Sequence, residues 1–499
     1  MNNIRRNLSI MVQGTHSDSG KSILVTALCK IFADEGRSVA PFKSQNMALN
    51  SYITKEGYEI GRAQGIQAEA AGVEASVHMN PILIKPSGEM KSQIVLHGKP
   101  YRDMHASAYR QEFFEQGLQA IKESYSKLAE EYDCIVIEGA GSPAEINLND
   151  RELVNMRVAR LVDAPVILVG DIDRGGVFAS LIGTLQLLDE EDRERIKGVI
   201  INKFRGDISL LQSGLDWFEQ YTGIPVIGVI PYITDLEIDS EDSLALDQYS
   251  GGTNAEADID IAVISHPAFS NFTDVDPLRL EPDCNLRFVK KASQLGNPDV
   301  IILPGTKNTA LALQFLVETG LDKKILRLVN KGTHIFGICG GFQMLGEKVL
   351  DSFEVESDEK VVKGLGVLPI ITEMQLEKKT VQATGFTDLF GSSAKLTGYE
   401  VHMGLSKSTQ AVSHFAVLNG EKEGCNVDNG KIVGTYLHHV FHNDKFRGDY
   451  LNHIREEKGL ESLTRTMNIN ECKQNEFNRL AQYVKQNVDI ERIKKMMKK

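Results

Sequence analysis

The chain has 499 residues, of which 42% are hydrophobic and 25% charged. This is ordinary globular composition, and the length predicts two domains rather than one hydrophobic core. The formal net charge of −13 argues against general nucleic-acid binding, because such binding needs a basic surface that displaces phosphate counterions.

Six scattered cysteines without a C-x-x-C pair argue against disulfides and structural zinc. No apolar run reaches the roughly 18–20 residues that cross a bilayer, and the N-terminus leads into a strand pattern rather than a cleavable signal. We therefore expect a cytoplasmic protein that binds neither membrane nor nucleic acid. The oligomeric state stays open, a homo-oligomer included.

Residues 1–245 repeat a short apolar run, a turn with Gly or Asp, and a helical stretch. Near-continuous runs rich in Val and Ile are typical of parallel strands that are buried on both faces. The runs are LSIMVQG, SVAPFK, YDCIVIEGA, APVILVGD, IKGVIINK and IPVIGVIP. They predict an α/β domain built on a parallel sheet.

A glycine-rich loop, GTHSDSGKS, follows the first apolar run and precedes an amphipathic helix. Such a loop points backbone N–H groups at a phosphate, and the helix N-terminus adds positive potential. We expect ATP to be bound by Gly14, Thr15, Ser19, Gly20, Lys21 and Ser22. Lys21 would reach the β/γ oxygens, and Ser22 would hold Mg²⁺. A turn that only caps the helix is the alternative.

The spacing of this loop is one residue longer than G-x-x-x-x-G-K-[ST], and it resembles the loop of dethiobiotin synthetase. Mg²⁺ needs further oxygen ligands, which come from the C-terminal ends of neighbouring strands in this architecture. Glu138 in IVIEGAGSPAE and Asp171 in VGDIDRGG follow such strands, and we expect both to be magnesium ligands. Taken alone, Asp171 could equally cap a helix.

Three further side chains at strand ends are candidates for ligand contacts. Lys43 in PFKSQN and Arg174 in GDIDRGG could contact a phosphate or a substrate carboxylate. Asn202 in IKGVIINK resembles the Asn-Lys pair that reads the base in related P-loop proteins. An ordinary strand-end turn is the alternative for each.

An acidic and then Gly/Ser/Asn-rich stretch predicts a linker over residues 246–257. A second α/β series, with IDIAVIS, DVIILPG and HIFGICGG, then covers residues 258–455. The strand-like pieces GLGVLPI, TGYEVHMG and KIVGTYLHH predict added antiparallel strands. Residues 456–499 read as a charged helical segment, whose basic end is typical of a solvated helix terminus.

Cys339 stands between an apolar strand and a helix in HIFGICGGFQMLG. The glycines around it permit a sharp turn that exposes the sulfur at a helix N-terminus, where the thiolate is favoured. We therefore expect a reactive cysteine, although a lone cysteine is more often structural. The N–H of Gly340 and the backbone of Gly305 would form an oxyanion hole.

Thiolate chemistry needs a proton donor for the leaving amine, and IVGTYLHHVFHN offers His438, His439 and His442. We expect His438 to fill this role. A metal site is the alternative, because His438 and His442 are one helical turn apart, but no cysteine or carboxylate of suitable spacing joins them.

Cys339 in GICGG and His438 in GTYLHH resemble the catalytic pair of class I glutamine amidotransferases. Most members place a glutamate two residues after the histidine, where this chain has Val440. That departure is the pattern of the cobyric and cobyrinic acid synthase branch, so the resemblance implies a Cys-His dyad.

Nearly the whole chain resembles the cobyric acid synthase family, through GTHSDSGKS, PFKSQNMALNS, IEGAGSPAEINL, GDIDRGGVFAS, NKFRGD, SNFTDVDPL, LPGTKNT, GICGGFQMLG and GYEVHMG. The resemblance implies a P-loop domain followed by a glutamine amidotransferase domain, with ATP, Mg²⁺ and glutamine as requirements. It also implies a corrinoid substrate, adenosylcobyrinic acid a,c-diamide, whose b, d, e and g carboxylates are amidated.

Three alternatives remain at this point. A cobyrinic acid a,c-diamide synthase shares both domain types, although QNMALNS and NFTDVDPL favour the cobyric branch. A partition-type P-loop ATPase switch would need no glutaminase half. A non-catalytic nucleotide-binding scaffold would turn over no ATP.

Overall fold

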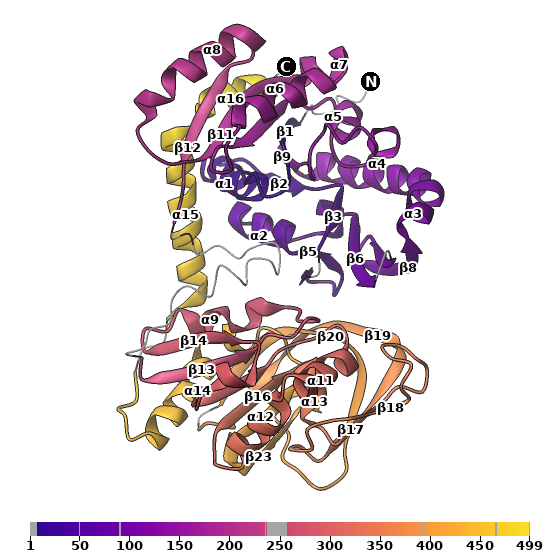
Figure 1. Ribbon diagram of the computed structural model, residues 1–499, viewed down its shortest axis with the longest axis vertical. Helices are drawn as coiled ribbons and strands as arrows, with labels where there is room; N and C mark the ends of the chain where they lie inside the picture. The colour runs from indigo at the N-terminus through magenta and orange to yellow at the C-terminus, as the bar shows by residue number, and fades with distance from the viewer. Residues whose placement is uncertain are drawn as a thin grey trace. The chain divides into compact units, whose positions relative to one another are not determined.

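In the computed structural model, the described residues are 7–48, 50–88, 91–234, 236, 257–391, 393–464 and 467–498. They belong to two compact units, residues 1–241 with 473–499 and residues 242–472 (Figure 1). The expected linker lies outside the described residues except for Ala257. The last residues of the chain, expected as a separate helical segment, belong to the first unit from residue 473 onward.

The central sheet of the first unit has six parallel strands in the order β12-β11-β10-β1-β9-β2. Their bounds are β1 Leu8–Gly14, β2 Val39–Phe42, β9 Cys134–Glu138, β10 Val166–Asp171, β11 Ile196–Phe204 and β12 Val226–Pro231. Every one of the six predicted runs forms a strand of this sheet. The chain order reverses at β1, so the loop that follows β1 opens at the edge where α/β proteins bind ligands.

Both faces of this sheet are covered, as the apolar runs predicted. Met11 enters one core together with α4 (Phe114–Glu131), whereas Ile10 and Val12 enter another with α1 (Lys21–Asp34). The remaining α-helices before the second unit are α2 Arg62–Ala71, α3 Ala106–Glu112, α5 Met156–Leu161, α6 Val177–Leu187, α7 Glu190–Arg195 and α8 Gln212–Thr222.

The C-terminal helices α15 (Ile469–Asn487) and α16 (Ile490–Met497) pack on the same core as α1. Leu480, Val484 and Ile493 are buried there, and Val488 forms a β-bridge with Gly228 of β12. Within the expected segment, helices form over Ile469–Asn487 and Ile490–Met497, and their exposed side chains are polar or charged. None of the helices among the described residues is long and apolar enough to cross a bilayer.

A smaller sheet, which the sequence did not predict, follows β2. Its order is β3-β6-β7-β8, and β4 and β5 form a separate pair. The bounds are β3 Gln45–Met47, β4 Ser51–Ile53, β5 Glu59–Gly61, β6 Ile82–Gly88, β7 Lys91–Leu96 and β8 Lys99–His105. A buried ion pair joins Lys85 of β6 to Glu59 of β5.

The main sheet of the second unit has the order β14-β13-β15-β16-β24-β23, with only β23 antiparallel to its neighbour. The bounds are β13 Ile259–Ile264, β14 Cys284–Val289, β15 Val300–Leu303, β16 His334–Ile338, β23 Cys425–Val427 and β24 Ile432–Thr435. Its α-helices are α9 Asp276–Arg279, α10 Ala292–Leu295, α11 Thr309–Glu318, α12 Leu321–Val329, α13 Gly340–Leu345 and α14 Asp444–Glu457.

A second, largely antiparallel sheet completes this unit and confirms the predicted α/β class with antiparallel additions. Its strands are β17 Lys348–Leu350, β18 Val361–Lys363, β19 Ile370–Thr387, β20 Ala394–Ser408, β21 Ala416–Leu418 and β22 Glu421–Glu423. The expectation of a strand in GLGVLPI is wrong, because only Ile370 is extended. The N–H groups of Leu365 and Leu368 donate instead to carbonyls at the end of α13.

Candidate functional site

The predicted phosphate loop joins β1 to α1 in the first unit. Gly20 has a positive φ of 97°, and a Cβ at that position would clash with the side chain of Asn202. The Asn202 amide donates to the Ser19 carbonyl over 2.9 Å. The structure therefore places Asn202 against the loop, and both glycine freedom and close approach explain Gly20.

Two hydroxyl donors of this loop have no acceptor among the described residues. Lys21 Nζ is buried and donates to the His16 carbonyl at 3.0 Å, a contact within the loop itself. The hydroxyls of Thr15 and Ser19 are buried and have no hydrogen-bond partner among the described residues. Because buried polar atoms are nearly always paired, the loop has the properties of a site that a ligand rich in acceptors completes.

Glu138, at the end of β9, lies beside this loop and collects three donors. Its carboxylate accepts hydrogen bonds from Ser22 Oγ (2.8 Å), Lys43 Nζ (2.9 Å) and Gln67 Nε2 (2.6 Å). The structure thus brings together Ser22, Glu138 and Lys43, three of the predicted residues. Gln67 on α2 was not predicted, because no motif surrounds it.

Asp171, at the end of β10, pairs with a different cation. Lys203 Nζ lies 2.8 Å from its carboxylate, and burial, which alone would raise the pKa of Asp171, is outweighed by Lys203, so the pKa is lowered. Arg174 is largely exposed and lies 3.5 Å from Asp18 and 3.9 Å from Asp171. These residues form a second group of charges at the same edge of the sheet.

Cys339 occupies the turn between β16 and α13 in the second unit. Its φ of 53° is in the left-handed region, which non-glycine residues adopt rarely and often at functional sites. A Cβ at Gly340 would clash with Thr306, and one at Gly341 with the Leu303 carbonyl. The glycines therefore let this turn press against the end of β15, as a nucleophile elbow requires.

His438 follows β24, and an ion pair holds its ring. Nδ1 lies 2.7 Å from the Asp274 carboxylate, whose other oxygen accepts the backbone N–H of His439 at 2.9 Å. Both side chains are only 1% exposed. Asp274 comes from a 3₁₀ turn at Phe272–Val275, within the SNFTDVDPL motif.

The protonation state of His438 follows from this geometry. Burial alone would lower the pKa of His438, but the charges of Asp274 and Cys339, with hydrogen bonds to both side chains, raise it to about 10. Burial likewise opposes ionisation of Asp274, yet His438 lowers the pKa of that carboxyl. The pair is therefore an imidazolium next to a carboxylate at neutral pH, and the ring is also hydrogen-bonded to the Cys339 side chain.

The position where most class I members have a glutamate is filled by Val440, which is fully buried in the hydrophobic core. Asp274 supplies a carboxylate from a segment 164 residues earlier in the chain. The Tyr399 ring stacks on His438 with centroids 5.0 Å apart. The sequence could have pointed to Asp274 only as an acidic residue inside a motif.

The predicted oxyanion residues lie on two segments, Gly340 in this turn and Gly305 just after β15. Gly340 is the first residue of α13, directly after Cys339. A Cβ on Gly305 would stand 3.1 Å from His438 Cε1, so a larger residue there would press on the imidazole. The ring centroids of His439 and His442 lie 4.2 Å apart, and among the described residues neither ring belongs to a group of three side chains that could hold a metal ion.

Comparison with known proteins gives two family models that divide the chain as the two sites do. The CobQ/CobB/MinD/ParA nucleotide binding domain matches residues 10–245. The CobB/CobQ-like glutamine amidotransferase domain matches residues 260–446. The phosphate loop thus lies in a nucleotide-binding domain, and Cys339 and His438 lie in a glutamine amidotransferase domain.

The relatives that match nearly the whole chain and are described below are all cobyric acid synthases. The chain is 58% identical to the cobyric acid synthase of Geobacillus sp. (strain WCH70), with 98% of each chain covered. It is 56% identical to that of Geobacillus thermodenitrificans (strain NG80-2) over 99% of each chain, and 51% identical to that of Streptococcus sanguinis (strain SK36) over 97% of this chain. Identity at this level over the whole length shows that the chain belongs to the cobyric acid synthase family.

Proposed function

We propose that this chain is a glutamine-hydrolysing ligase that amidates the b, d, e and g carboxylates of adenosylcobyrinic acid a,c-diamide, in cobalamin biosynthesis. The observation that carries the proposal is the buried Cys339–His438–Asp274 arrangement in a chain that also contains a phosphate loop with unpaired donors. ATP and glutamine are cytoplasmic metabolites, so we place the activity in the cytoplasm.

The amidoligase half would be residues 1–245. The orphan hydroxyls of Thr15 and Ser19 and the buried ammonium of Lys21 fit the phosphates of ATP, and the Ser22–Glu138 pair offers the oxygen ligands that Mg²⁺ prefers. Bound Mg²⁺ would neutralise charge on the phosphates. Lys21 would hold the γ-phosphate in line for attack by a substrate carboxylate, which forms an acyl phosphate and ADP.

Asp171 and Lys43 would change partners when MgATP or the corrinoid binds. Both are paired with a neighbour, Asp171 with Lys203 and Lys43 with Glu138, and both lie at strand ends that face the phosphate loop. We propose Asp171 as a further metal ligand that exchanges Lys203 for Mg²⁺. Lys43 and the exposed Arg174 are proposed contacts for phosphate or for a corrinoid carboxylate.

The glutaminase half would be residues 258–455. The Cys339 thiolate attacks the glutamine carboxamide, and the N–H of Gly340 with the backbone at Gly305 stabilises the oxyanion. His438, kept protonated by Asp274, delivers the proton to the leaving ammonia. Water then hydrolyses the glutamyl thioester, and the ammonia displaces phosphate from the acyl phosphate to give the amide.

The proposal is tested by incubating the chain with the a,c-diamide, MgATP and glutamine. The mass of the corrinoid product is then measured by mass spectrometry. Four new amides are expected. Amidation of the a and c groups of cobyrinic acid, with no reaction of the a,c-diamide, would favour the a,c-diamide synthase instead. Glutamine hydrolysis that survives in Cys339→Ala would reopen the partition-type ATPase, whose switch needs no glutaminase.

A further inference from the structure

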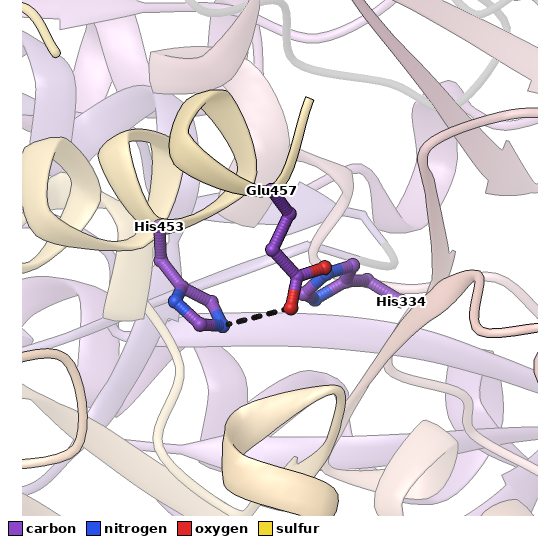
Figure 2. Close-up of side chains that lie close together, drawn as sticks. All are labelled: His334, His453 and Glu457. Carbon is purple, nitrogen blue, oxygen red and sulfur yellow. Dashed lines mark hydrogen bonds and ion pairs between the residues drawn. The ribbon is translucent and has the colours of Figure 1, made fainter. Parts of the chain in front are cut away.

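A second cluster of metal-ligating side chains lies at the start of β16, at the end of this strand opposite to Cys339. His334 Nε2 is 2.9 Å from one carboxylate oxygen of Glu457, and His453 Nε2 is 3.8 Å from the other. Figure 2 shows both rings turned toward this carboxylate, and the three ligand atoms all lie within 4.8 Å of one another. Among the described residues, this is the one such group of three.

The fold brings these side chains together for simple reasons. His453 and Glu457 are four residues apart on α14, so they share one face of the helix. His334 is the first residue of β16 and is only 4% exposed. The His453 Nε2 atom is buried without a hydrogen-bond partner in the described part of the chain, because Glu457 is too far away for one.

Two imidazoles and one carboxylate are a common protein ligand set for Zn²⁺. In a tetrahedral site with ligand bonds of about 2.0–2.1 Å, neighbouring ligand atoms stand about 3.3 Å apart. The distances of 2.9 Å (His334) and 3.8 Å (His453) lie on either side of this value, but they run to different oxygens of Glu457, so the carboxylate would have to turn until one oxygen faces both rings. We propose that His334, His453 and Glu457 bind one divalent transition-metal ion of the zinc class, with water as the fourth ligand.

One neighbouring charge opposes a cation at this place. Lys431 Nζ lies 3.3 Å from Glu457, and its side chain is 29% exposed, so it can swing into solvent when the ion binds. Lys431 therefore competes with the metal rather than excluding it.

The role of the ion would be structural. Cys339 follows the five residues of β16, so its Cα lies roughly 16 Å along the strand from the Cα of His334, too far for the ion to act on the reaction. The ion would clamp α14 to β16. Cys339 directly follows β16, and α14 follows the turn after His438. A metal ion that joins α14 to β16 would therefore fix the two segments that hold the catalytic pair.

The test uses untagged full-length Cys339→Ala protein in excess Mg²⁺, so that neither the active-site thiolate nor the nucleotide site captures the probe. Co²⁺ is titrated in, and the visible absorption of tetrahedral cobalt is followed. We expect one equivalent to bind. His453→Gln should weaken binding at least about tenfold, whereas His414→Gln, at an exposed histidine of the same unit, should not change it.

Two further variants test the same site if His453→Gln fails to fold, which circular dichroism would show. Lys431→Met removes the competing cation and should tighten Co²⁺ binding, and Glu457→Gln should weaken it. Zn²⁺ should raise the thermal unfolding midpoint of the Lys431→Met protein more than that of its parent. Equal Co²⁺ affinity in the parent, His453→Gln and Glu457→Gln proteins would overturn the proposal, as would a weaker affinity in Lys431→Met.

Discussion

The two sites of this chain share a plan but differ in what they have already assembled. Each lies where an inner strand of a parallel sheet turns into a helix, after β1 in one unit and after β16 in the other. In the phosphate loop, the hydroxyls of Thr15 and Ser19 have no hydrogen-bond partner in the described part of the chain. In the cysteine site, His438 and Asp274 already form a closed pair. The first site therefore offers hydrogen-bond donors that a ligand can use, whereas the second already holds its ion pair in place before a substrate binds.

The largest effect is expected from Cys339→Ala, which should inactivate the glutaminase site and leave the ATP-dependent site active. Cys339→Ala removes the nucleophile and should lower glutamine-dependent amidation at least about 10⁴-fold. Amidation with added ammonia should stay close to the parent rate, because the phosphate loop is untouched. The measurement is the steady-state rate with each nitrogen source. Equal loss with both sources would show that the two chemistries are not divided as proposed.

Asp274→Asn should have the next largest effect, because the ring of His438 loses the charge that holds it protonated and oriented. We expect glutaminase kcat to fall about 10³-fold while KM for glutamine changes little. Tyr399→Phe is the matched control, since it keeps the ring stacked on His438 and alters no charge at this pair. An unchanged kcat in Asp274→Asn would remove the aspartate from the mechanism.

Lys21→Met should lower ATP-dependent amidation about 10²-fold, whether glutamine or ammonia supplies the nitrogen. Glutaminase activity measured alone should keep the parent rate. The rates with both nitrogen sources at saturating ATP check this result. A loss seen only with glutamine would contradict the assignment of Lys21 to the phosphates.

The pH profile gives the smallest and most specific effect. The raised pKa of His438, about 10, keeps the ring protonated throughout the neutral range. Asp274→Asn should lower this pKa and move the alkaline limb of the glutaminase rate to lower pH by at least about one unit. A limb at the same pH in both proteins would show that Asp274 does not set the pKa.

The same shift has a consequence for stability. Because the folded-state pKa of His438 lies above its ordinary value of 6.5, the imidazolium stabilises the fold fully below pH 6.5. This contribution is lost as the pH rises through about 10. Hydrogen exchange at His438 and its neighbours should therefore become faster with rising pH by more than the intrinsic chemistry explains, and less so in Asp274→Asn.

Local patterns in the sequence predicted a large part of this molecule. The six strands of the sheet that contains β1 could be predicted because they are apolar on both faces. The turn at Cys339 could be predicted because glycines surround it. The small sheet after β2 was not readable. Its outer strand β8 is almost wholly exposed, and β3 has only three residues, so neither carries an apolar run.

Contacts between distant segments escaped prediction. Asp274 reaches His438 across 164 residues, and Gln67 reaches Glu138 across 71, so no spacing rule connects them. GLGVLPI looked like a strand because it is apolar, yet its glycines and Pro369 fit a loop that wraps the end of α13. A single sequence shows what a segment can do locally, whereas these features depend on which segments meet.

In this mechanism, one chain both releases nitrogen from glutamine and transfers it to the corrinoid carboxylates. The most direct measurement uses the a,c-diamide, MgATP and glutamine labelled with ¹⁵N at the amide, followed by mass spectrometry of the corrinoid. We expect four new amides, each carrying ¹⁵N, from the parent protein and none from Cys339→Ala. New amides without the label, or labelled amides from Cys339→Ala, would contradict it.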